Sequence, residues 1–158
     1  MASLFFIKEV TTMSDKPDSP YILSLQEGDN LFQNILQFAD LVNIKSAVLN
    51  GLGAVSDITI GYFHRDTQQQ VKRLFSGTYE LVSLTGNITI FGKDRFLHIH
   101  AAIGDDKYQV FGGHVIDALA SASTEIAIIP LTYPVFRKNH PELDIKVICP
   151  FSINHNQI

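Results

Sequence analysis

The sequence is poor in cysteine and in charged residues, and it contains no tryptophan. Its single cysteine, Cys149, excludes an internal disulfide and any metal or redox motif built from paired cysteines. A metal site would therefore have to use histidine, aspartate or glutamate. Charged residues make up 18% of the 158 residues and hydrophobic residues 46%. This low share of charge favours a surface that another subunit partly covers.

Positive charge and long hydrophobic runs are also scarce. The formal net charge of -4 disfavours a nucleic-acid partner, because binding to phosphates depends on clustered Lys and Arg. The densest basic stretch contains Arg137, Lys138 and His140, and it predicts a short solvated loop. The apolar run at residues 4–7 is far shorter than the ~20 residues of a membrane span or the ~7–15 of a signal-peptide core. We therefore expect a soluble, cytoplasmic protein without a membrane partner.

The length predicts one domain, because 158 residues suffice for one well-buried core and are too few for two ordinary domains. Residues 11–20 combine two prolines with Thr, Ser and Asp, which predicts a turn or linker. We expect a partly flexible N-terminal segment at 1–20, a folded domain at 21–150 and a C-terminal tail at 151–158.

A single helix is predicted, at residues 30–43. Asp29 offers an N-cap, and apolar residues then recur at helical spacing between Leu31 and Val42. Beyond this helix the hydrophobic period changes to two, or to short apolar runs rich in Val, Ile, Phe and Tyr. One helix with many strands is typical of an α+β domain, in which the helix packs on a mixed or antiparallel sheet.

The strands are predicted from these runs and from the Gly and Asp turns between them. Residues 114–122 leave strand, loop and helical turn open, and Pro134 with residues 137–142 predicts a loop. The predicted strands lie at 21–25, 46–52, 57–63, 71–76, 79–91, 96–103, 108–112 and 125–131, with a short last strand at 145–148.

Three histidines form the pattern that best indicates chemistry. On a strand, residues two apart point to the same face, so His98 and His100 present their imidazoles side by side. The turn at residues 104–107 should return the chain as a hairpin and bring His114 beside them. A two-residue loop would place His114 on the opposite face, whereas a three-residue loop or a one-residue bulge would place it across from His98. The metal hypothesis therefore predicts an irregularity in this hairpin, for which the Gly112-Gly113 pair is suited.

Three imidazoles with an open fourth position suit zinc, and they also accept Fe, Ni, Co or Cu. The spacing alone leaves open whether these histidines bind a metal or are structural side chains in a half-buried sheet. Each ligating ring needs a partner for its second nitrogen, and the nearby carboxylates in the sequence belong to Glu80, Asp105 and Asp106. The adjacent pair Asp105 and Asp106 is more simply interpreted as turn residues.

Other catalytic motifs are missing. The segment Gly51-Leu52-Gly53-Ala54-Val55 lacks the third glycine and the helix of a dinucleotide-binding fingerprint, so it predicts a tight turn. Neither Ser83 nor Ser121 lies in the context of a nucleophile elbow.

Four fragments in this order resemble the PPC (plant and prokaryote conserved) domain family. They are the GLGAV segment at 51–55, GTYELVSLTGN at 77–87, His98-Ile99-His100-Ala101 and Gly112-Gly113-His114. The resemblance extends from about residue 21 to 150. It implies an α+β fold with strands around a helix, and a homotrimer built by sheet packing between subunits.

The resemblance also implies a metal-like site near the subunit boundaries, at His98, His100 and His114. Glu80 matches an acidic position of the family and is a candidate to support a ligand, face a substrate or take part in catalysis. Plant members carry AT-hooks before this domain, but no Arg-Gly-Arg-Pro core occurs here, and Thr78 stands where plant members commonly have Arg. The label of DNA-binding protein that prokaryotic members often carry thus loses its physical support.

We predict a homotrimeric interaction or ligand-binding module whose three histidines hold zinc or another divalent transition metal, with a small molecule as a further ligand. One alternative is a metal-dependent hydrolase or lyase, in which the metal lowers the pKa of its bound water to about 7 and Glu80 or an aspartate moves protons. The other alternative is a DNA-binding regulator, which the acidic charge disfavours.

Overall fold

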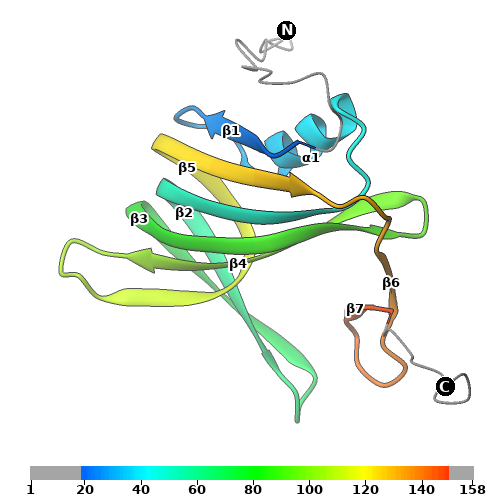
Figure 1. Cartoon of the computed structure of the whole chain (residues 1–158). Helices are drawn as coiled ribbons and strands as arrows, with labels where there is room; N and C mark the ends of the chain where they lie inside the picture. The colour runs from blue at the N-terminus through cyan, green and yellow to red at the C-terminus, as the bar shows by residue number, and fades with distance from the viewer. Residues whose placement is uncertain (1–18, 150–158) are drawn as a thin grey trace, which may run out of the picture.

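Two long antiparallel strands run through the centre of the molecule (Figure 1). The computed structural model describes residues 19–149. Strand β2 (Ala47–His64) pairs with β3 (Gln69–Phe91) from end to end, and the hairpin between them projects as an arm. These strands are rich in Val, Ile, Phe and Tyr, which pack well on a pleated surface.

The remaining strands complete one seven-stranded sheet. Strand β5 (Val110–Pro130) pairs with the free side of β2, and β1 (Tyr21–Leu25) adds to β5. Strand β4 (Asp94–Gly104) bonds to both β3 and the start of β5, so β2, β3, β4 and β5 form a ring of hydrogen-bonded neighbours. Over residues 19–149, the strand-rich, one-helix domain predicted from the sequence is confirmed.

Helix α1 (Leu31–Leu41) lies within the predicted range of 30–43. Its N-cap is Asn30, whose side chain accepts a hydrogen bond from Gln33 N at 2.9 Å. The prediction of Asp29 as the cap is wrong, because the Asp29 carboxylate instead accepts from Gln26 N. The helix stops before the predicted end because Asn43 adopts a positive φ of 55°, which no α-helix continues.

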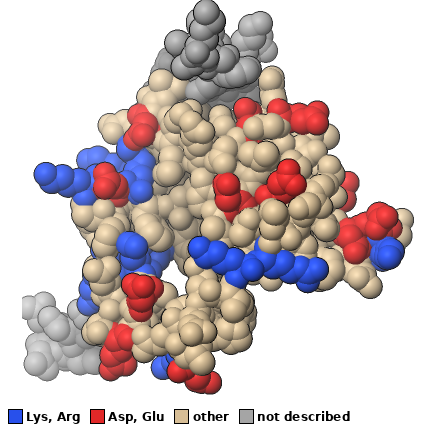
Figure 2. Space-filling view, turned by 180° about the vertical axis from the view of Figure 1, so that it is seen from behind, with Lys and Arg blue, Asp and Glu red and all other residues tan. Residues whose placement is uncertain are grey.

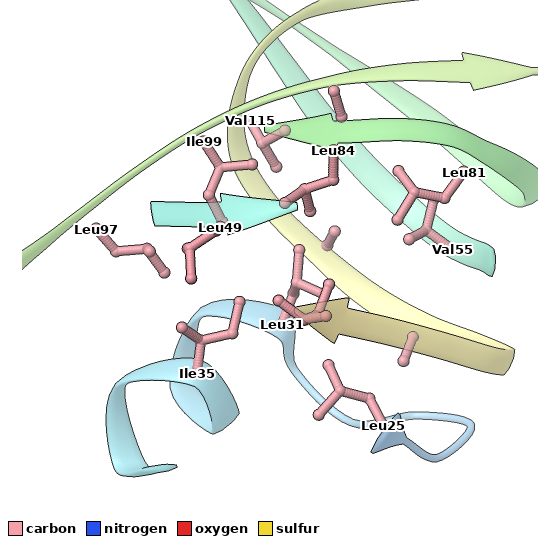
Figure 3. Packing of buried hydrophobic residues seen from close by; sticks show 14 of the residues in the cluster. Leu25, Leu31, Ile35, Leu49, Val55, Leu81, Leu84, Leu97, Ile99 and Val115 are labelled. Atoms are coloured by element: carbon pink, nitrogen blue, oxygen red, sulfur yellow. The ribbon is translucent and has the colours of Figure 1, made fainter. Parts of the chain in front are cut away.

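The core lies between α1 and the inner face of the sheet. Figure 3 shows Leu31 and Ile35 of the helix lying near Leu49 of β2. From Leu97 to Ile103, every second residue of β4 is buried in the same cluster. Burial of such side chains is worth about 1.5–3 kcal/mol each, so this cluster fixes which face of β4 points inward. None of the helices in the described range is long and apolar enough to span a membrane.

The tight turn predicted at residues 51–55 is wrong. These residues lie within the continuous strand β2. The pairing of β2 with β3 shifts register between Gly51 and Gly53 and between Ser56 and Ile58. Gly53 has a φ of 127°, and a Cβ atom there would lie 2.2 Å from the Ser123 carbonyl oxygen. The glycines therefore provide a bulge inside a continuous strand. The predicted break between 76 and 79 is likewise absent, and residues 114–122 are strand, within β5.

The loop predicted for residues 137–142 is wrong over its first part. Residues Phe136–Asn139 form β6, which runs parallel to β3 and pairs with β7 (Lys146–Ile148), the predicted short last strand. Arg137, expected to be solvated, is only 8% exposed. The Ser46 hydroxyl helps to anchor this segment, because it accepts a hydrogen bond from Val135 N at 2.8 Å.

Candidate metal centre

The alternation of β4 sets the direction of two histidines. Because Leu97, Ile99 and Ala101 face the core, His98 and His100 face the opposite, outer side of the sheet. The prediction that these two imidazoles lie side by side is confirmed, with ring centroids 5.1 Å apart.

The hairpin between β4 and β5 brings His114 to the same face. Residues 105–109 form its loop, in which the Asp105 carboxylate accepts hydrogen bonds from Lys107 N at 3.0 Å and Gln109 N at 2.8 Å. Asp105 is thus a turn residue, as the sequence indicated. His114 lies across from His100, and the pairing of the two strands has no register shift.

The predicted loop length and the predicted irregularity of this hairpin are therefore wrong. A loop of odd length gives the required parity by itself, so no bulge interrupts the ladder and His114 does not pair with His98. Gly113 has another use, because a Cβ atom there would lie 2.9 Å from the Gly61 carbonyl oxygen. The glycine lets β5 approach β2 closely beside His114.

The three rings form one cluster. The ring centroid of His114 lies 5.0 Å from that of His98 and 5.5 Å from that of His100. One ligand nitrogen from each ring lies within 4.8 Å of the others, with His98 and His114 half-buried and His100 exposed. Ligand nitrogens around a tetrahedral zinc with bonds of about 2.1 Å are roughly 3.4 Å apart. Small inward movements of the rings would therefore suit a transition metal.

Burial and neighbouring charge lower the pKa values of two histidines of the cluster, His98 and His114. Burial, followed by the positive charge of Arg137 and the two neighbouring imidazoles, lowers the pKa of His98 to about 4. Burial and the neighbouring His100 also lower the pKa of His114. A neutral imidazole has the lone pair that metal ligation needs, so near pH 7 these two rings are in a form that can bind a metal.

Arg137 is the functional neighbour that sequence reasoning missed. Its Nη2 atom donates to Asn87 Oδ1 at 2.9 Å and lies 3.2 Å from His98 Nδ1. Because a guanidinium can only donate, the His98 nitrogen must be the acceptor. The only sequence signal at Arg137 is its place in a short basic stretch, which suggested solvent exposure.

The predicted carboxylate partners lie elsewhere. Glu80 pairs with Gly104, on the histidine face but four residues along β4 from His100, which corresponds to about 13 Å of strand. Within residues 19–149, the group of side chains close enough together to bind a metal contains only histidines. A pocket of about 200 Å³ adjoins it, lined by Thr85, Gly86, Asn87, His98 and His100. The site thus consists of three imidazoles, a small open pocket and a buried guanidinium.

A sequence profile of the Plants and Prokaryotes Conserved (PCC) domain, which is the same domain as PPC, matches residues 13–132. The chain belongs to this family. A search among curated proteins gave no match. The PCC fold is also found in solved structures that resemble this chain, which supports the resemblance inferred from the four sequence fragments.

Three of these structures illustrate the likeness. A plant- and prokaryote-conserved protein of Pyrococcus horikoshii is 26% identical with a TM-score of 0.79, and the match covers 85% of this chain and 94% of that one. A protein of Archaeoglobus fulgidus described as metal-containing is 27% identical with a TM-score of 0.77, covering 84% and 94%. A Bacteroides thetaiotaomicron protein, whose given name suggests DNA binding, is 25% identical with a TM-score of 0.79, covering 82% and 91%.

Proposed function

We propose that this PCC-domain protein binds one divalent transition metal, of the zinc type, through His98, His100 and His114, and presents it to a small ligand in the adjoining pocket. The observation that carries the proposal is the convergence of three ligand nitrogens within 4.8 Å on one sheet face. The metal-containing relative supports it. A bound metal would supply Lewis acidity at the mouth of the pocket, while the protein fixes the ligands on rigid strands.

Elemental analysis of untagged protein tests the metal site. We expect about one transition metal per chain in the wild type and almost none in His98→Ala, because two remaining imidazoles hold a metal weakly. His64→Ala is the matched control, since His64 is an exposed strand histidine outside the cluster. Full metal content in His98→Ala, or loss in His64→Ala, would contradict the site assignment.

We also propose that three copies associate through the outer face of the sheet. This face carries exposed apolar side chains, among them Ile22 at 70% exposure, which water would otherwise cover. By strand alternation, four of these side chains lie on the same outer face as His100. They belong to β1, β2 and β5 and are Ile22, Val48, Leu52 and Ile129.

Light scattering tests this assembly. The wild type should have three chain masses, and Val48→Asp should shift it to smaller species because a charge would be buried in the interface. Leu41→Asp is the control, since Leu41 is exposed on α1, on the other side of the sheet. A monomeric wild type would overturn the proposal.

DNA binding and catalysis have less support. On the face shown in Figure 2, Lys and Arg form separate patches with Asp and Glu between them, whereas a DNA interface needs a continuous basic surface. We propose that the chain does not bind DNA, so retention on a DNA column at low salt should be absent. For catalysis, no carboxylate of residues 19–149 joins the cluster to move protons, so binding is favoured over hydrolase or lyase activity.

A further inference from the structure

Arg137 is a buried cation without a carboxylate partner. Its Nε atom donates to Thr89 Oγ1 at 2.9 Å, and Nη1 donates to the Lys146 carbonyl oxygen at 2.8 Å. Together with Asn87 and His98, all four acceptors are neutral groups. Among residues 19–149, the one ion pair joins Arg95 and Asp40 at another position. Its guanidinium also lies over the Phe96 ring, 4.9 Å from the ring centroid. Within residues 19–149, Arg137 therefore has a cation–π contact but no anionic partner beside the histidine cluster.

The hydrogen bond from Arg137 to His98 and metal ligation by His98 exclude each other. A neutral imidazole has one lone pair and one N–H group. If a metal takes Nδ1, the lone pair that Arg137 uses is lost. If a metal takes Nε2, the proton moves to Nδ1 and then points at the N–H group of Arg137. In both cases Nη2 of Arg137 must leave His98, and it then has an N–H group without a partner.

The pocket beside the cluster offers further donors. Asn87 lines it and uses its Oδ1 atom to accept from Arg137, so its amide N–H groups remain for another acceptor. Thr85 adds a hydroxyl group. A loaded site would hold three positive charges, two from a divalent metal and one from Arg137, and the cluster includes no carboxylate to balance them. Burial of such charge is costly unless an anion pairs with it.

We propose that the small ligand of this site is an oxyanion, a carboxylate or a phosphate, selected by Arg137 once the metal has displaced Nη2 from His98. This inference rests on the proposed metal function. Arg137 acts through its charge and its freed N–H group, since charge-assisted hydrogen bonds to carboxylate and phosphate are the strong ones. The pocket volume of about 200 Å³ is sufficient for a carboxylate or phosphate group.

Cobalt-substituted protein tests the proposal with acetate and its neutral analogue acetamide as probes. Cobalt uptake is first measured by equilibrium dialysis, and the visible absorption of the bound ion then reports ligand binding. We expect acetate to change the spectrum saturably and acetamide to have little effect. Arg137→Gln should weaken acetate binding about tenfold while cobalt uptake stays equal or rises, because a repelling charge and a competitor for His98 are gone.

Asn87→Asp provides a second variant, which keeps the hydrogen bond to Arg137 but replaces the amide donors that line the pocket with a negative charge. It places a carboxylate against Nη2 of Arg137 and so neutralises the guanidinium in place, with the hydrogen bond retained. It should weaken acetate binding as Arg137→Gln does, even if the latter fails to fold. Asn50→Asp is the matched control, because Asn50 lies on β2 across from Thr85 and adds the same charge without contacting Arg137.

Failure of the inference and failure of the metal function give different results. Cobalt uptake with equal binding of acetate and acetamide, or with acetate affinity unchanged in Asn87→Asp, would overturn the oxyanion inference alone. Absence of cobalt uptake would overturn the metal function, and the inference with it. Weakening by Asn50→Asp as large as that by Asn87→Asp would show a general surface-charge effect and would also overturn the role of Arg137.

Discussion

At the scale of single residues, His98 joins the two parts of the candidate site. Its ring contacts His100 and His114 within the cluster, and its Nδ1 atom accepts from Arg137 of β6. The sequence predicted the first relation, because strand alternation alone puts His98 and His100 on one face. It did not predict the second, because Arg137 is 23 residues beyond His114 and lies in a segment with a loop-like composition.

The lowered pKa of His98 predicts a loss of stability in acid for the metal-free protein. In the unfolded chain this ring takes up a proton near its ordinary pKa of 6.5, whereas in the folded chain it does so only at about 4. Between these values the unfolded state binds more protons, so the free energy of unfolding falls as the pH is lowered from about 6.5 to about 4. Urea unfolding of metal-free wild type and His98→Gln at several pH values measures this. The variant should depend less on pH, and equal slopes would contradict the assignment.

At the scale of elements, the sequence predicted which segments are helix and strand better than it predicted how far they extend. The apolar periods located α1 and nearly all strands. The segment Gly51-Leu52-Gly53 was interpreted as a turn, but in this sheet it forms a bulge within a long strand, because the partner strands on both sides continue past it. Local sequence does not show whether such a partner exists. The same limit explains why the loop of the β4–β5 hairpin, predicted at residues 104–107, lies at residues 105–109.

The bulge at Gly53 predicts a large effect of one methyl group. In Gly53→Ala, the added Cβ would meet the Ser123 carbonyl oxygen at 2.2 Å, and alanine is strained at a φ of 127°. We expect a loss of about 3 kcal/mol or more in the free energy of unfolding. Gly77→Ala is the control, since Gly77 has a φ of 87° with no atom near its Cβ position, and it should lose only about 1–2 kcal/mol. Equal losses of unfolding free energy in the two variants, measured with urea, would show that the close approach of β2 and β5 at Gly53 does not add to the destabilisation.

At the scale of the whole molecule, a metal bound between β4 and β5 should stabilise the fold. A ligand at 100 times its dissociation constant adds about 2.7 kcal/mol if it binds only the folded state. For a domain of this size that corresponds to roughly 5–10 °C in Tm. Thermal unfolding before and after treatment with a chelator, with metal then restored, measures the shift. His98→Ala should show no response to the chelator, and a similar response there would place the metal elsewhere.

The position of the histidines in the chain has a consequence for the order of events during protein synthesis. All three lie on the consecutive hairpins of β3, β4 and β5, and hairpins form within about 1–10 μs. Arg137 follows His114 by 23 residues, which corresponds to about 1–5 s of translation. During that interval the lone pair of His98 has no competitor. If the three histidines bind a metal as proposed, capture by the nascent chain would avoid the displacement of the arginine that loading of the finished protein requires.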